Sequence, residues 1–215
     1  MRSRPIAYNN VGMMTMMKMT LRSLLLIAPL CGLTLVACSE GTPDDAPAAE
    51  ATAMPDAAAM VRAEVARTIE IAGEKMVALA EAMPQEAYAW RPAEGVRSVS
   101  EVYMHVAGTN YWFPTLVGGM PPESSGVTAA YNTVPPMEQV TDKAAVVATL
   151  SASFEYLVDF VANAPADRLD EAIDMFGSAT TVRGVLVETT IHLHEHLGQS
   201  IAYARTNGVT PPWSG

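Results

Sequence analysis

Cysteine is nearly absent from this chain of 215 residues, which contains only Cys31 and Cys38. Both lie near the amino terminus, inside or just after an apolar run from Leu24 to Val36. The rest of the sequence has none, so neither a disulfide nor thiol chemistry is expected there. That part of the chain must therefore be stabilised by the packing of its side chains.

Basic residues are also scarce, with 13 Lys and Arg against 23 Asp and Glu. Residues 1–37 contain four of the basic residues and no acidic one. Without this segment the balance is 9 against 23, a net charge of −14. A chain this acidic repels polyanions, so we expect no nucleic acid among its partners.

Residues 1–37 contain, in order, the basic, apolar and cleavage regions of a signal peptide. Lys18 and Arg22 precede the apolar run, and Leu35-Val36-Ala37-Cys38 follows as a cleavage site. The apolar run of about 13 residues is shorter than the roughly 20 that a permanent membrane-spanning helix needs. It is therefore interpreted as a signal and not as an anchor. Translation from Met1 and translation from near Met17 both fit this pattern.

Leu-Val-Ala-Cys resembles the bacterial lipobox. The resemblance implies cleavage before Cys38 and attachment of a lipid to its sulfur, which would hold the protein at a membrane. Ser39 is not Asp, and in bacteria with two membranes this implies sorting to the outer membrane, facing the periplasm. The alternative is an ordinary secretory cleavage site with a chance cysteine.

Residues 38–58 are rich in Pro, Ala, Gly, Ser and acidic residues, and contain almost nothing large to bury. Such a composition is typical of a flexible linker, here one that would lift the domain off the membrane. Residues 59–215 then have the usual length of one domain with one core.

Apolar side chains recur at helical spacing in four segments of this domain. The predicted helices cover about 57–83, from 99 to before 118, from 141 or 142 to about 163, and from about 181 to 207. Ser98 and Glu101 form a capping-box pattern at the second start. Pro84 and Pro165 end the first and third helices, and Asn207-Gly208 is a left-handed cap for the fourth.

Four amphipathic helices without an alternating strand pattern predict an all-α fold, a four-helix bundle. The segment 118–139 is rich in Gly, Pro, Ser and Thr, and is predicted to be a long crossover between the second and third helices. Either a lid or a simple connection fits this composition. The piece before the fourth helix is predicted to be short and irregular.

Three of the four histidines are expected on inward helix faces. His192 and His196 are four positions apart, about 40° around a helix axis from each other. His194 is rotated away by about 200° and is excluded. His105 lies among the apolar positions of the second helix.

Imidazoles from two helices can bind one face of zinc, nickel, copper or iron(II) and leave other positions open. His105, His192 and His196 are therefore the candidate metal ligands. Glu188, one turn before His192, is a candidate hydrogen-bond acceptor for a ligand histidine, or else a surface acid. The run HLHEH lacks the H-E-x-x-H pattern of zinc proteases, which disfavours that class.

Two stretches resemble the DinB-like family. These are AMPQEAYAWRPAEGVRSVSEVYMHVAGTNYW at 82–112 and HLHEHLGQSIAYARTNGVTPPWS at 192–214. The resemblance, with matching helix order, covers about residues 59–214. It implies a helical bundle, a metal triad at His105, His192 and His196, and a divalent ion such as zinc or nickel. Family bundles often pair as dimers, so a homodimer is among the expected states.

The resemblance leaves the reaction and the small-molecule ligand unassigned, because a bundle does not define chemistry. The family's thiol-dependent transferases act in the cytoplasm, and this domain is expected outside it. Three hypotheses follow from the residues. They are a metal-dependent hydrolase or thiol transferase, a metal- or ligand-binding lipoprotein without turnover, and a structural bundle whose histidines only form hydrogen bonds.

Overall fold

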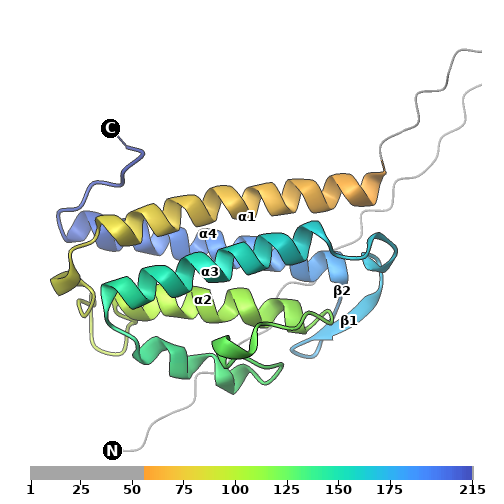
Figure 1. The fold of residues 1–215 in the computed structure, drawn as a ribbon, viewed down its shortest axis with the longest axis horizontal. Helices are drawn as coiled ribbons and strands as arrows, with labels where there is room; N and C mark the ends of the chain where they lie inside the picture. Colours follow the sequence, from red (N-terminus) through yellow and green to blue (C-terminus); the bar gives the residue numbers. More distant parts are fainter. Residues whose placement is uncertain (1–55, 215) are drawn as a thin grey trace, which may run out of the picture. The chain divides into compact units, whose positions relative to one another are not determined.

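The structure, a computed structural model, describes residues 56–214. The predicted signal peptide, the lipidation site Cys38 and nearly all of the predicted linker lie outside the described residues. Within the described part, four long helices form a bundle, which confirms the predicted all-α fold (Figure 1).

The four helices are α1 (Ala57–Ala82), α2 (Val99–Thr115), α3 (Lys143–Ala162) and α4 (Val182–Thr206). Helices α1 and α4 run in one direction, and α2 and α3 run in the other (Figure 1). Because the neighbours α2 and α3 are parallel, the chain must return along the whole bundle between them. This topology explains why the crossover is long.

The helix ends form where the sequence signals predict them. Ser98 caps α2 in a complete capping box, since its hydroxyl accepts from the Glu101 amide and the Glu101 carboxylate accepts from the Ser98 amide. The Asp142 and Thr181 side chains cap the starts of α3 and α4 by accepting from the Ala145 and Gly184 amides, without a reciprocal bond. Gly208 has a φ of 76°, so α4 ends in the predicted left-handed conformation.

A two-stranded antiparallel hairpin stands where an irregular piece was predicted. Strands β1 (Ala172–Met175) and β2 (Ser178–Thr181) pair through a two-residue turn at Phe176-Gly177. Four residues per strand are too few to show a clear alternation, and Phe-Gly is not a recognised hairpin turn sequence. These two features explain why sequence patterning missed the hairpin.

The crossover contains three short 3₁₀ helices, η2 (Glu123–Ser125), η3 (Tyr131–Thr133) and η4 (Pro135–Gln139). Two further 3₁₀ turns of three residues each are η1 (Gln85–Ala87) and η5 (Ala166–Arg168). The crossover packs closely on α2 at Gly108, where an added Cβ would lie 2.7 Å from Val134 Cγ1. Val134 is fully buried, so this segment is an integral part of the fold.

The core lies between the four helices and is mostly aliphatic and aromatic. Tyr88, Tyr111 and Trp112 are buried in it. By length and composition α3 could cross a membrane, and in the described bundle it packs against α1 and α2.

Candidate metal centre

The three predicted histidines meet between α2 and α4. The Nε2 atom of His192 lies 3.2 Å from Nε2 of His105 and 3.2 Å from Nε2 of His196. One potential ligand atom from each residue lies within 4.8 Å of the others. The two helices therefore bring together the three imidazoles that the helical spacing selected.

The fourth histidine is not part of this group. His194 is exposed, and its Nδ1 lies 2.9 Å from the Thr190 carbonyl one turn earlier on α4. His105 is buried at 5% exposure, and His192 and His196 are half-buried. The predicted exclusion of His194 agrees with this arrangement.

A carboxylate from the crossover orients the buried histidine. Glu138 Oε1 lies 3.0 Å from His105 Nδ1, and its other oxygen accepts from Arg97 Nε at 3.0 Å. Burial acts to raise the pKa of Glu138, but the hydrogen bonds to His105 and Arg97 outweigh it and lower that pKa. The carboxylate is therefore ionised and accepts a hydrogen bond from His105 Nδ1.

A second chain of hydrogen bonds orients His196. Tyr203 donates its hydroxyl hydrogen to the Arg97 carbonyl at 3.1 Å, and the Tyr203 oxygen accepts from Gln199 Nε2 at 2.9 Å. This fixes the amide of Gln199 with its oxygen toward His196 Nδ1, at 2.8 Å. Because an amide oxygen only accepts, His196 Nδ1 must carry the hydrogen.

Both chains of hydrogen bonds have the same consequence for the imidazoles. With hydrogen on Nδ1, the Nε2 atoms of His105 and His196 are lone-pair donors that face Nε2 of His192. A hydrogen on His192 Nε2 can point at only one of them, so the lone pair of the other would stay without a partner. A cation at this point satisfies all three lone pairs.

The site favours neutral imidazole, the form that binds metal ions. Burial, followed by the charges that His196 and His105 can carry, lowers the pKa of His192 to about 3. Burial also lowers the pKa of His196, although its hydrogen bond to Gln199 acts in the opposite direction. Both rings are therefore neutral imidazoles at neutral pH, and proton competition for the site is weak.

The predicted acceptor Glu188 does not take part in this site. Its side chain is exposed, and His192 Nδ1 has no hydrogen-bond partner among the described residues. The orienting groups are instead Glu138 and Gln199, which sequence analysis did not select. Gln199 stands three residues after His196 on the same helix and could have been found by spacing. Glu138 could not, because it comes from the crossover.

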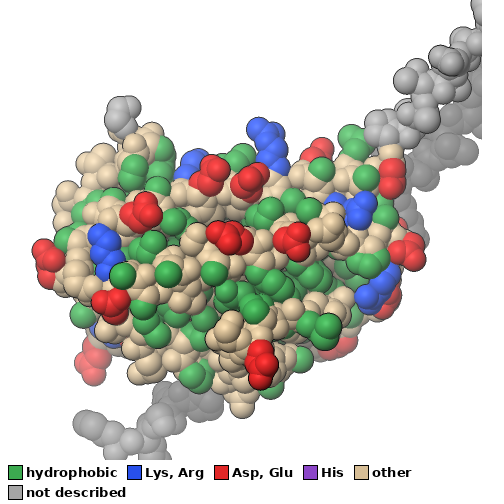
Figure 2. Space-filling model, viewed as in Figure 1, with side chains coloured by type: hydrophobic (Ala, Val, Ile, Leu, Met, Phe, Trp, Pro, Cys, Tyr) green, Lys and Arg blue, Asp and Glu red, His purple; other side chains and the backbone are tan. Residues whose placement is uncertain are grey.

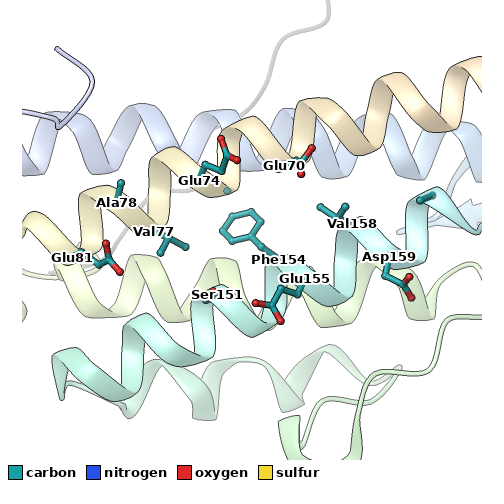
Figure 3. Close-up of a pocket in the computed structure, with 12 residues that line it drawn as sticks. Glu70, Glu74, Val77, Ala78, Glu81, Ser151, Phe154, Glu155, Val158 and Asp159 are labelled. Atoms are coloured by element: carbon teal, nitrogen blue, oxygen red, sulfur yellow. The ribbon is translucent and has the colours of Figure 1, made fainter. Parts of the chain in front are cut away.

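A groove of about 660 Å³ lies elsewhere, along the contact between α1 and α3 (Figure 3). Val77, Phe154 and Val158 form part of its floor, and its rims carry Glu70, Glu74, Glu81, Glu155 and Asp159. Acidic side chains gather along both helices on this face, with hydrophobic ones between them (Figure 2). None of the three clustered histidines lines this groove.

The fold and the site define a class, a helical bundle with three inward histidines on two helices. The chain belongs to the DinB superfamily, whose family model matches residues 68–200. The predicted family resemblance is thereby confirmed.

The structure is also similar to the crystal structure of a DinB-like protein, YjoA, from Bacillus subtilis. The two share 22% sequence identity with a TM-score of 0.53, and the match covers 68% of this chain and 93% of that one. At this identity the similarity shows the fold alone. A search of curated proteins found no match.

Proposed function

We propose that His105, His192 and His196 bind a divalent metal ion such as zinc or nickel, in an extracytoplasmic lipoprotein anchored through Cys38. The observation that carries the proposal is the convergence of three Nε2 atoms, with two tautomers set by independent hydrogen-bond chains. Three neutral imidazoles are a common donor set for such ions.

The surrounding residues fit a bound cation. His105 and His196 each donate through Nδ1 to an acceptor, Glu138 or Gln199, as metal-ligating histidines usually do. The ionised carboxylate of Glu138 also supplies negative charge next to His105. In a protein without metal, at least one of the facing Nε2 lone pairs would have no partner, which is unfavourable.

A bound ion would supply Lewis acidity and lower the pKa of a bound water or thiol. The chain's own residues would hold that ion from one side and keep the imidazoles in the binding tautomer. This combination suits a metal-dependent hydrolase or a thiol transferase. The lipid anchor and the signal peptide would place this chemistry in the periplasm, at the outer membrane.

One observation favours a second candidate, a metal- or ligand-binding lipoprotein without turnover. Glu138, the carboxylate that contacts the triad, is already bonded to both His105 and Arg97. Glu188 and Glu195 are exposed on α4. Among the described residues no carboxylate is therefore free at the triad to act as a general base.

Metal analysis of the processed chain, purified from membranes, tests the proposal. We expect close to one divalent ion per chain, lost in His192→Ala and retained in the matched control His194→Ala. Absence of metal from the wild-type chain, even after incubation with zinc or nickel, would support a structural bundle instead. Turnover with a panel of esters, amides and thiol acceptors then separates an enzyme from a binder.

A further inference from the structure

Two large hydrophobic side chains are exposed at one end of the bundle. Met120, between Gly118-Gly119 and Pro121-Pro122, is 87% exposed. Phe176, at the turn of the β1–β2 hairpin, is 76% exposed. These are the highest exposures among the large hydrophobic side chains of the described residues, and we refer to the pair as the apolar tip.

Phe176 also has an unusual backbone conformation. Phe176 has a φ of 56° and Gly177 a φ of 83°, the left-handed conformations of a two-residue hairpin turn. Asn or Asp before Gly is favoured in such a turn, and a bulky residue at positive φ is strained. Phenylalanine is therefore unfavourable at this position both for the turn and for its contact with water, a combination that occurs at functional positions.

The apolar tip lies at the end of the bundle where the chain enters the domain. Phe176 stacks on Trp112 near the end of α2, with ring centroids 5.5 Å apart. Arg168 of η5 donates to the Val117 carbonyl in the loop that leads to Met120, at 3.3 Å. Figure 1 shows the hairpin, the end of α2 and the start of α1 at this same end.

We propose that the apolar tip inserts into the surface of the lipid bilayer to which Cys38 anchors the chain. Cys38 lies eighteen residues before Asp56, where the described part of the chain begins. A chain of that many residues spans at most about 60 Å even when fully extended, so the anchor would hold this end of the domain within that distance of the membrane. The anchor raises the effective concentration of the apolar tip at the membrane, so a small apolar contact is sufficient to keep the tip bound there.

Charge at this end favours an apolar contact over an electrostatic one. Arg168 pairs with Glu171, and Arg183 pairs with Asp170, so two of the cations near the hairpin are already paired with acids. Electrostatic binding of this surface to anionic lipid headgroups would therefore contribute little free energy. The inference goes beyond the metal site and does not depend on it. It depends on the lipid anchor.

Site-specific labelling tests this proposal in the complete chain. After processing, Cys31 is expected to leave with the signal peptide and the sulfur of Cys38 to carry lipid, so Phe176→Cys or Met120→Cys introduces the one reactive thiol. Each variant carries a fluorophore and is reconstituted into vesicles of phosphatidylethanolamine and phosphatidylglycerol. Glu86→Cys, exposed on η1, is the matched control.

Fluorophores at positions 176 and 120 should be quenched by nitroxide-labelled lipids and protected from iodide. The fluorophore at position 86 should show the opposite pattern. Equal responses at all three positions would overturn the proposal. Protection of position 176 from both quenchers would also overturn it, because that result indicates a protein partner or a second copy of the chain.

A second variant separates membrane contact from folding. Phe176→Asn supplies the residue that the turn prefers, so its melting temperature should equal or exceed that of the wild type. The same substitution should lower the lipid contact reported from position 120 by roughly tenfold, because the larger apolar side chain is lost. Unchanged lipid contact in this variant would contradict the proposal.

Discussion

The contacts of α1 with α3 and of α2 with α4 are chemically different. Between α1 and α3, Phe154 packs directly onto Gly73, where an added Cβ would lie 2.7 Å from the ring. Between α2 and α4, the place of such apolar packing is taken by His105, His192 and His196. We refer to these as the apolar seam and the histidine seam.

The difference indicates a division of roles within one bundle. Burial of apolar surface stabilises the fold irrespective of any ligand. The histidine seam instead contains a buried nitrogen, His192 Nδ1, that has no partner among the described residues. A polar group in that condition lowers stability, and in stable proteins such positions are often functional. The two seams should therefore respond differently to substitution.

The largest effect on stability is expected in the apolar seam. Phe154→Ala removes a buried ring and should lower the free energy of unfolding by about 3–5 kcal/mol, measured by denaturant titration. The metal content of the folded variant should equal that of the wild type. Loss of metal together with stability would show that the two seams are not independent.

A substitution of the orienting carboxylate should affect the histidine seam. Glu138→Ala removes the acceptor of His105 Nδ1 and should weaken metal binding by about 10–100-fold, measured by competition with a chelator. Glu138→Gln keeps an acceptor oxygen and should recover part of this loss. Glu123→Gln, an exposed acid of the same crossover, is the control and should bind as the wild type does. Equal affinity in all of these variants would rule out an orienting role.

A smaller effect on metal affinity is expected from Tyr203, at the far end of the hydrogen-bond chain that orients His196. Tyr203→Phe removes the hydroxyl between Gln199 and the Arg97 carbonyl, and so releases the amide that fixes His196. Unfolding free energy should fall by about 1 kcal/mol, and metal affinity should fall less than in Glu138→Ala. A loss of stability at unchanged affinity would assign Tyr203 to packing alone.

The smallest effect is expected at Glu188. Its exposed side chain lies outside the hydrogen-bond chains of the site, so Glu188→Ala should change metal affinity by less than about twofold and stability by within about 0.5 kcal/mol. A large loss of affinity would show that Glu188 reorients toward His192 Nδ1 when metal binds. The sequence-based role of Glu188 would then be restored.

The parts of the fold that depend on local signals were predictable from sequence. Helix periodicity, the Ser98–Glu101 capping box and the Gly208 cap act within a few residues, and each forms as expected. The histidine triad was accessible for the same reason, since i, i+4 spacing places His192 and His196 on one face. Only the choice of His105 required an assumption about packing between helices.

The remaining features depend on long-range contacts. Glu138 reaches His105 because the crossover returns along α2, and no local pattern shows where a loop will lie. Arg97 takes part in both hydrogen-bond chains, through its side chain to Glu138 and through its carbonyl to Tyr203, which is 106 residues away. The β1–β2 hairpin was missed because its turn contains Phe176 where Asn is usual.

The most direct test of the account is X-ray absorption at the metal edge of the purified, metal-loaded chain. We expect three imidazole nitrogens coordinated to the ion, at about 2.0–2.1 Å if the ion is zinc. His192→Ala should lose this signature, and His194→Ala should retain it. A first shell of oxygen atoms alone, or a spectrum unchanged by His192→Ala, would contradict a three-histidine centre between α2 and α4.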